Sequence, residues 1–194
     1  MIKSLCIFCG SRHGTSPKYH AQAARLGELC GQYAVDVVYG GGHVGLMGVV
    51  ADTAMAAGGT VRGLIPERLL KREVGHPGIS ELIVTENMFD RKDRMIAESD
   101  AFAVLPGGLG TLDELFEVLT LRQLGYHRKP IVLVNVDGFW DPLNTLIRQV
   151  VEHDFADADV YPMMQIVQDA DAVLPALGID EDGGDTEPLR RAAP

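Results

Sequence analysis

The chain has 194 residues, of which 46% are hydrophobic and 23% are charged, and its formal net charge at pH 7 is −10. This length suits a single domain, and the composition is that of a folded globular protein rather than a disordered one. So negative a charge excludes a broad basic surface for nucleic acid or for an anionic membrane, although it permits a local basic pocket.

The sequence contains no apolar run long enough to cross a bilayer, and the apolar start of the chain is interrupted at Gly10, Ser11 and Arg12. We therefore expect neither a signal peptide nor a transmembrane helix. Three cysteines are an odd number for a disulfide framework, so we expect reduced thiols and a cytoplasmic location. Cys6 and Cys9 are spaced as C-x-x-C, but inside a strand they would point to opposite faces of the sheet, which argues against a redox or metal role.

Short apolar runs, many of them β-branched, alternate along the chain with stretches of helical periodicity. The expected elements, in chain order, are a strand at 5–9, a helix at 17–32, a strand at 35–39, a helix at 46–57, strands at 61–65 and 82–84, a helix at 88–98, a strand at 101–105, a helix at 111–124, a strand at 131–134, a helix at 139–153, a strand at 164–167 and a helix at 170–177. Residues 67–80 are more polar and are expected to be irregular. Residues 179–194 are expected to form a disordered tail.

This alternation predicts an α/β fold, namely a Rossmann-like, doubly wound parallel sheet with helices on both faces. We expect residues 1–178 to form it as one nucleotide-binding catalytic domain. In such sheets ligands bind at the carboxyl ends of the strands, where loops lead into helices. The glycines of this chain cluster in two loops of that kind.

The first glycine-rich loop reads GGGHVGLMG at residues 40–48, and the second reads PGGLGT at residues 106–111. Without side chains, such loops let backbone N–H groups approach an anion at a helix N-terminus. Glycine equally serves close packing of a strand against a helix. We favour phosphate binding for the second loop and leave both interpretations open for the first.

The first loop also matches the dinucleotide-binding pattern G-x-G-x-x-G through Gly40, Gly42 and Gly45, with Glu67 beyond the next strand as a candidate ribose partner. Because the match follows the second expected strand and not the first, a redox enzyme is only our third hypothesis for the function. Neither loop has the lysine of a Walker A motif. No histidine is spaced from another histidine or from a cysteine as metal ligands usually are, so we expect no metal site.

Glu114 and the charged segment around Arg91 are the candidate chemical groups. Thr111 and Glu114 have the T-x-x-E spacing of a capping box, so a purely structural role for Glu114 is an open alternative. Asp113 is expected to be a solvated acid that complements the helix dipole. Arg91 and Lys92 lie at the start of an expected helix, where a mixed-charge surface is the simplest alternative.

Several segments, in this order, resemble one family: the LOG-type proteins, which are cytokinin riboside 5′-monophosphate phosphoribohydrolases and are often mislabelled lysine decarboxylases. The matching segments are CIFCGSRHG, VYGGGHVGLMG, GLIPERL, the M-x-x-R-K at residues 88–92, SDAFAVLPGGLGTLDELFEVLT, QLGYHRKP and VNVDGFWDPL. Together they span most of residues 4–155. The signature P-G-G-x-G-T-x-x-E, preceded by S-D-A-F, is the most specific of them.

The resemblance implies a homodimer without a redox cofactor that cleaves the N-glycosidic bond of AMP or of a cytokinin riboside 5′-monophosphate, releasing the free base and ribose 5-phosphate. It assigns catalysis to Arg91 and Glu114. It assigns substrate contacts to Glu73, Lys92, Gly107, Gly108, Gly110, Thr111 and Thr120. Most members have glutamate immediately before the R-K pair, where this chain has Asp90, so the preference between adenine and an isoprenylated base stays open.

Cleavage at ribose C1′ builds oxocarbenium-like charge, which a nearby carboxylate stabilises while it orients the attacking water. Glu114 is the candidate for both tasks, and Arg91, which stays charged, is expected to act by electrostatics and orientation. A non-catalytic carrier of the same fold, such as the molybdenum-cofactor carriers, is the stronger competitor. A true lysine decarboxylase would need pyridoxal phosphate on a lysine, for which the chain offers no clear candidate.

Overall fold

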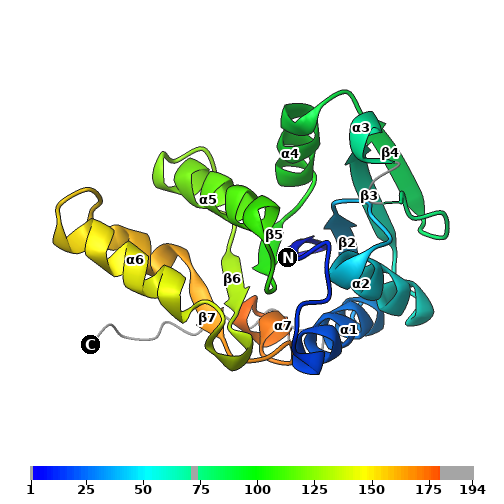
Figure 1. Cartoon of the computed structure of the whole chain (residues 1–194), viewed down its shortest axis with the longest axis horizontal. Coiled ribbons are helices and arrows are strands. Elements are labelled where there is room, and N and C mark those ends of the chain that lie inside the picture. Colours follow the sequence, from blue (N-terminus) through cyan, green and yellow to red (C-terminus); the bar gives the residue numbers. More distant parts are fainter. Residues whose placement is uncertain (1, 71–73, 180–194) are drawn as a thin grey trace.

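The computed structural model describes residues 2–70 and 74–179, which contain a seven-stranded parallel sheet in the order β4-β3-β2-β1-β5-β6-β7 (Figure 1). The strands are β1 (Ser4–Phe8), β2 (Asp36–Tyr39), β3 (Val61–Pro66), β4 (Glu81–Thr85), β5 (Ala101–Val104), β6 (Ile131–Val134) and β7 (Gln165–Val167). The chain runs outward from β1 to β4 and then returns to β5 on the other side of β1. The strand order therefore reverses between β1 and β5, which is where ligands bind in open α/β sheets.

Helices connect the strands and cover both faces of the sheet (Figure 1). They are α1 (Pro17–Gln32), α2 (Gly45–Ala56), α3 (Glu67–Leu70), α4 (Met88–Ala97), α5 (Leu109–Gln123), α6 (Asp141–Glu152) and α7 (Val173–Ala176), with 3-10 helices η1 (Val136–Gly138) and η2 (Ala158–Met163). Local signals fix two of the starts. The Ser16 side chain accepts a hydrogen bond from the Lys18 N–H at the start of α1, and the Asn87 side chain accepts from Phe89 and Asp90 at the start of α4.

Two apolar cores lie on opposite faces of the sheet. One packs α1, α2 and α7 against residues such as Leu5 and Ile7, and the other packs α4, α5 and α6 against residues such as Cys6 and Phe8. Alternate residues of β1 thus enter different cores, as a strand buried on both faces requires. Cys9 belongs to the first core and Cys6 to the second, so the prediction that these two thiols face apart is confirmed. The doubly wound α/β architecture is confirmed as well.

The expected elements are confirmed except in a few extents. The expected helix at 170–177 is one turn, because the Asp169 carboxylate accepts the Ala172 N–H at its start and Gly178, with φ of 78°, follows its end. The stretch 67–80, expected to be irregular, contains the short helix α3, and the 3-10 helices η1 and η2 were not expected. Glu73 and residues 180–194 of the expected tail lie outside the described residues. Within the described ranges, no helix is long and apolar enough to span a membrane.

Candidate active site

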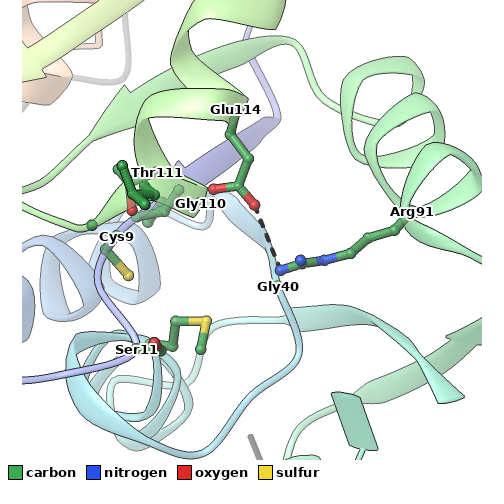
Figure 2. A pocket seen from close by; sticks show the side chains of 11 residues that line it. Cys9, Ser11, Gly40, Arg91, Gly110, Thr111 and Glu114 are labelled. Atoms are coloured by element: carbon green, nitrogen blue, oxygen red, sulfur yellow. Dashed lines mark ion pairs between the residues drawn. The ribbon is translucent and has the colours of Figure 1, made fainter. Parts of the chain in front are cut away.

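A cavity of about 140 Å³ opens at the carboxyl ends of β1 and β2, beside the point where the strand order reverses (Figure 2). Its wall is built from the end of β1, the first residue after β2, Met47 of α2, Arg91 of α4 and the first two turns of α5. Both glycine-rich loops contribute to it, through Gly40 and through residues 108–110. This is the edge of the sheet at which the sequence predicted a ligand site.

Arg91 and Glu114 form a buried ion pair in the wall of this cavity. The guanidinium Nη2 lies 3.6 Å from the carboxylate Oε1, and the two side chains are only 7% and 9% exposed. Figure 2 shows them extending toward each other from α4 and α5, with Gly40 beside the guanidinium. Because each charge is nearly removed from water, each compensates the desolvation of the other. The distance exceeds that of a short charge-assisted hydrogen bond, and both residues line the cavity.

The orientation of Arg91 is set by the backbone around it. Its Nε donates a hydrogen bond to the Leu64 carbonyl oxygen at 3.0 Å, and Nη1 lies 3.8 Å from the Met88 sulfur. A Cβ placed on Gly40 would clash with Nη2, so only glycine leaves room for the guanidinium at this position. The fold thus positions the arginine from β3, from its own helix and from the first glycine-rich loop.

The capping-box explanation of Glu114 is wrong. Helix α5 begins at Leu109, two residues before the expected start, and Gly108 is its N-cap without any side-chain cap. Thr111 is therefore the third residue inside the helix, and its side chain packs against Gly107 instead of capping. Glu114 lies one turn further along, is 8% exposed and lines the cavity, where its carboxylate extends toward Arg91 (Figure 2).

The second glycine-rich loop leaves the start of α5 open. Apart from the adjoining backbone, a Cβ on Gly108 or on Gly110 would meet nothing within 4 Å, so packing against other parts of the described chain does not explain either glycine. The first turn of α5 contains no acidic side chain that would satisfy its N–H groups. An exposed helix N-terminus with bare backbone is an arrangement that binds phosphate.

The glycines of the first loop, in contrast, are explained by contacts within the chain. Gly45 has φ of 63°, and a Cβ there would clash with the backbone of Ser11. A Cβ on Gly48 would clash with the His43 carbonyl. The packing interpretation left open for this loop is therefore favoured, and Glu67, the candidate ribose partner, is an exposed residue of α3.

A larger hollow of about 580 Å³ adjoins the cavity and shares Ser11, Gly108 and Leu109 with it. It lies between the loop after β1 and the second glycine-rich loop, and Gly107 is part of its wall. Tyr19 and Phe139, whose rings meet edge to face at 5.8 Å between centroids, form its aromatic side. The two spaces together fall in the size range of small-molecule sites.

The remaining candidate residues are not all brought to the cavity. Lys92 forms ion pairs with Asp113 at 3.0 Å and with Glu117 at 2.9 Å, and these contacts join α4 to α5. Burial alone would lower the pKa of Lys92, but the hydrogen bonds with Glu117 and Asp113 outweigh it and raise the pKa. Thr120 is exposed on α5 and lines neither space, and Glu73 lies outside the described residues.

Sequence reasoning missed the wall contributed by the end of β1. Cys9 and Ser11 line the cavity, although neither was predicted to have a role there: Cys9 was considered only as part of C-x-x-C, and both belong to the segment CIFCGSRHG. Burial raises the pKa of the Cys9 thiol well above its usual range, and the Glu114 carboxylate raises it further, while Arg91 opposes this. Cys9 is therefore a neutral part of the wall and not a nucleophile. Its position one residue after the first strand of a doubly wound sheet was the available signal.

The residues around these spaces do not fit pyridoxal phosphate. That cofactor is held by a lysine that forms a Schiff base with it. No lysine of the described segments lines either space, and Lys92 is engaged by two carboxylates. The chemistry that a lysine decarboxylase needs is therefore not supported by this site.

Comparison with known proteins agrees with the motifs. Residues 47–177 match the family model described as "Possible lysine decarboxylase". The chain is 46% identical over 154 residues to the cytokinin riboside 5′-monophosphate phosphoribohydrolase LOG7 of Arabidopsis thaliana, covering 79% of this chain and 71% of that protein. It is 41% identical over 176 residues to the probable enzyme of the same name, LOG4, of Oryza sativa subsp. japonica, covering 91% and 76%.

Solved structures share the fold at lower identity. The molybdenum cofactor binding protein of Rippkaea orientalis superposes with a TM-score of 0.69 at 21% identity, covering 91% of this chain and 96% of that one. The molybdenum cofactor carrier protein of Chlamydomonas reinhardtii gives 0.69 at 18% identity with the same coverage. Identities this low support the fold alone. The family model and the relatives above 40% identity go further, and by them the chain belongs to the LOG family.

Proposed function

We propose that this chain is a phosphoribohydrolase, which cleaves the N-glycosidic bond of a nucleoside 5′-monophosphate into free base and ribose 5-phosphate. The observation that carries the proposal is the buried Arg91–Glu114 pair facing a cavity at the open start of α5. The names of the relatives, cytokinin riboside 5′-monophosphate phosphoribohydrolases, support it. A carrier needs a phosphate cradle but has no use for a paired acid beside the sugar.

In the proposed reaction, water attacks ribose C1′ while the bond from C1′ to the base nitrogen breaks and its electron pair leaves with the base. Glu114 stabilises the positive charge that develops on the sugar and takes the proton of the attacking water. The base receives a proton from solvent as it departs. Arg91 cannot donate a proton at neutral pH, so its role is to hold the Glu114 carboxylate and to orient the sugar.

The phosphate is the proposed anchor of the substrate. We place it at the N–H groups of the second glycine-rich loop and the first turn of α5, over Gly108, Gly110 and Thr111, with Gly107 leaving room for the Thr111 side chain. Binding energy gained there positions C1′ against Glu114, so nucleosides without the 5′-phosphate are expected to be poor substrates. The adjoining hollow is the space for the base, which we propose is adenine or an isoprenylated adenine.

We also propose that the enzyme is a cytoplasmic homodimer. Leu109 and Phe116 of α5 and its C-cap residue Leu124 are 85%, 39% and 65% exposed, at the spacing of a helix face that contacts another helix. Thr120 lies on the same face, so a contact between Thr120 and substrate would be made at this interface. The free cysteines, all buried, suit a reducing compartment. Sedimentation of the parent against Phe116→Glu tests the dimer, with a monomeric parent as the contrary result.

The activity is tested by incubating the purified chain with AMP, with an isoprenylated adenosine 5′-monophosphate and with adenosine, and by measuring the free base by chromatography. We expect base from one or both monophosphates and at least about tenfold less from adenosine. Tight binding of either monophosphate without release of base would support the carrier instead. Release of base from adenosine at the same rate would show that the 5′-phosphate does not anchor the substrate.

A further inference from the structure

Three metal-ligand side chains meet beside the first glycine-rich loop, away from the wall of the cavity. His76 Nε2 lies 3.0 Å from Asp52 Oδ1, and His43 Nε2 lies 3.6 Å from Asp52 Oδ2. The two imidazole rings are 4.1 Å apart between centroids, and one ligand atom from each of the three residues lies within 4.8 Å of the others. We propose that His43, Asp52 and His76 bind one divalent transition-metal ion, with Zn²⁺ as the best fit and water as the fourth ligand.

The distances suit a tetrahedral ion. With Zn–N and Zn–O bonds of about 2.0–2.2 Å, neighbouring ligand atoms of a tetrahedral zinc lie roughly 3.3 Å apart. Asp52 Oδ1 lies 3.0 Å from His76 Nε2, close to this value, whereas His43 Nε2 lies 3.6 Å from the other oxygen, Oδ2, so His43 has to move for both histidines to share one ion with Oδ1. The His43 side chain, which is 42% exposed, is able to rotate and bring its Nε2 closer to the ion. Two imidazoles and one carboxylate with an open position are a donor set that zinc accepts, whereas Mg²⁺ and Ca²⁺ prefer oxygen alone.

The backbone holds the two histidines in place before any ion binds. The His43 N–H donates to the Val74 carbonyl at 2.9 Å, and the His76 N–H donates to the Gly41 carbonyl at 3.0 Å. An antiparallel bridge between Gly42 and Gly75 lies between these bonds. Asp52 projects from α2, which packs on the core. Ligands on fixed supports lose little freedom on binding, so the site is preorganised.

The alternative is that His76 and Asp52 simply share a hydrogen bond. The Gly78 N–H donates to His76 Nδ1 at 3.1 Å, so in the metal-free chain Nδ1 has the lone pair and Nε2 donates its proton to Asp52. An imidazole that binds the ion through Nε2 carries its proton on Nδ1. Because Nδ1 can then no longer accept the Gly78 N–H, this amide has to turn away. A Cβ on Gly78 would meet only the His76 ring, at 3.5 Å and 3.8 Å, so the turn has room for this change. The Gly78 amide therefore distinguishes the metal-bound state from the hydrogen-bonded pair.

Other soft ligands of the described segments compete little. The three cysteines are buried, and burial raises the pKa of each thiol, for Cys30 to about 12. His13 and His20 form the other histidine pair, at 5.9 Å between centroids, and in the described residues no Asp, Glu or Cys joins them in a three-ligand group. This pair provides a matched control. The proposal does not depend on the hydrolytic reaction.

The experiment is a calorimetric titration of ZnCl₂ into the full chain, without a histidine tag and after treatment with chelator. We expect one zinc per chain. His43→Ala and Asp52→Asn, both at exposed positions, are expected to weaken binding by about 10–100-fold or more, whereas His20→Ala is expected to leave it unchanged. The His76→Ala chain is a third variant, and the first two keep the test valid if loss of this buried ring impairs folding.

The second measurement is the backbone ¹H–¹⁵N spectrum of the parent during the same titration. We expect the Gly78 amide signal to shift together with those of His43 and His76, and to stay in place in His43→Ala at the same zinc concentration. The proposal would be overturned if the parent did not bind zinc or if His20→Ala lost binding. It would also be overturned if His43→Ala and Asp52→Asn bound zinc as tightly as the parent. An unchanged Gly78 amide in a zinc-saturated parent would overturn the assignment of His76 as a ligand.

Discussion

The two glycine-rich loops have similar composition and contribute to the same cavity, but their glycines have different physical causes. In the loop after β2, the space in front of Gly40 is filled by the Arg91 guanidinium, and the space in front of Gly45 is filled by the Ser11 backbone. In the loop after β5, a Cβ on Gly108 or Gly110 would meet nothing within 4 Å apart from the adjoining backbone.

A glycine that is enclosed by its own chain serves packing, and one that faces open space at a helix start is available to a ligand. The first loop therefore supports a catalytic side chain, whereas the second is the proposed binding surface for the phosphate. Counting glycines in the sequence does not separate these tasks, since both loops follow a strand and precede a helix. Substitutions in and behind each loop test the difference.

The largest effect is expected behind the second loop, at Glu114. Glu114→Gln keeps the shape of the side chain but removes the charge that stabilises the sugar cation, so we expect kcat to fall by about 10²–10³-fold. Because Glu114 compensates the buried charge of Arg91, the variant is also expected to be less stable, by about 1–3 kcal/mol. Release of base from the monophosphate and thermal unfolding are the measurements.

Glu152→Gln, at an exposed carboxylate of α6, is the matched control and is expected to behave as the parent. If Glu114→Gln were folded and fully active, the carboxylate would have no role in the reaction, and the proposed catalytic role of Glu114 would be wrong.

The next effect is expected in the first loop, at Gly40. A methyl group there meets the far end of the Arg91 side chain and displaces the guanidinium from Glu114. A displacement of about 1 Å in a reacting group can cost about 100-fold in rate, so we expect Gly40→Ala to lose about this much activity. Its melting temperature should fall less than that of Glu114→Gln, because the arginine side chain can shift and the Glu114 carboxylate stays in place to compensate its charge.

Gly45→Ala is the counterpart in the same loop, and we expect it to lose more stability and less activity than Gly40→Ala. Its φ of 63° and the enclosed backbone of Ser11 leave nothing flexible to yield, so we expect a loss of stability of at least about 1–3 kcal/mol. The two variants are compared by urea unfolding and by kcat. Equal losses of stability in both would show that Gly40 supports packing in general and not the arginine.

These contrasts also show what the sequence could reveal. Apolar runs alternating with helical periodicity predicted the parallel sheet, because a strand buried on both faces needs apolar residues at nearly every position. The order of the strands is a property of crossovers and leaves no local pattern, so the wall formed by Cys9 and Ser11 was not foreseen. The motif resemblance pointed to Arg91 and Glu114, but only the fold shows that they form a buried pair.

The errors have local physical causes. The helix expected at 111–124 begins at Leu109, so α5 includes Gly110, a poor helix former whose propensity the tertiary context overrides. The capping box was a consequence of the expected start at 111. The cluster of His43, Asp52 and His76 left no spacing signal because its members come from two loops and a helix.

In the second loop, Gly110→Ala is expected to separate binding from folding. The position is the second residue of α5, where alanine is the better helix former, so we expect stability to rise by about 0.4–1 kcal/mol. The added methyl group enters the space in which we place the phosphate, so KM for the monophosphate should rise about tenfold with a smaller change in kcat. An unchanged KM would remove Gly110 from the phosphate site.

The smallest effect concerns Lys92, which joins the helix of the second loop to the helix of Arg91. Its pKa is raised above the ordinary value of 10.5 because the bonds with Glu117 and Asp113 outweigh burial. The folded chain thus holds this proton more tightly than the unfolded chain. The stabilisation is fully present below pH 10.5 and is lost as the pH rises through the folded pKa.

We therefore expect Lys92→Met to lower the free energy of unfolding by about 1 kcal/mol at neutral pH, and by less at about pH 11. Urea unfolding at both pH values is the measurement, and Lys18→Met is the control, because the Lys18 side chain is 65% exposed in its pair with Asp137. If Lys92→Met were as stable as the control but raised KM for the monophosphate, Lys92 would contact the substrate. The two carboxylates would then release it when the phosphate binds, and the Arg91–Glu114 pair would remain as an ionic contact between α4 and α5.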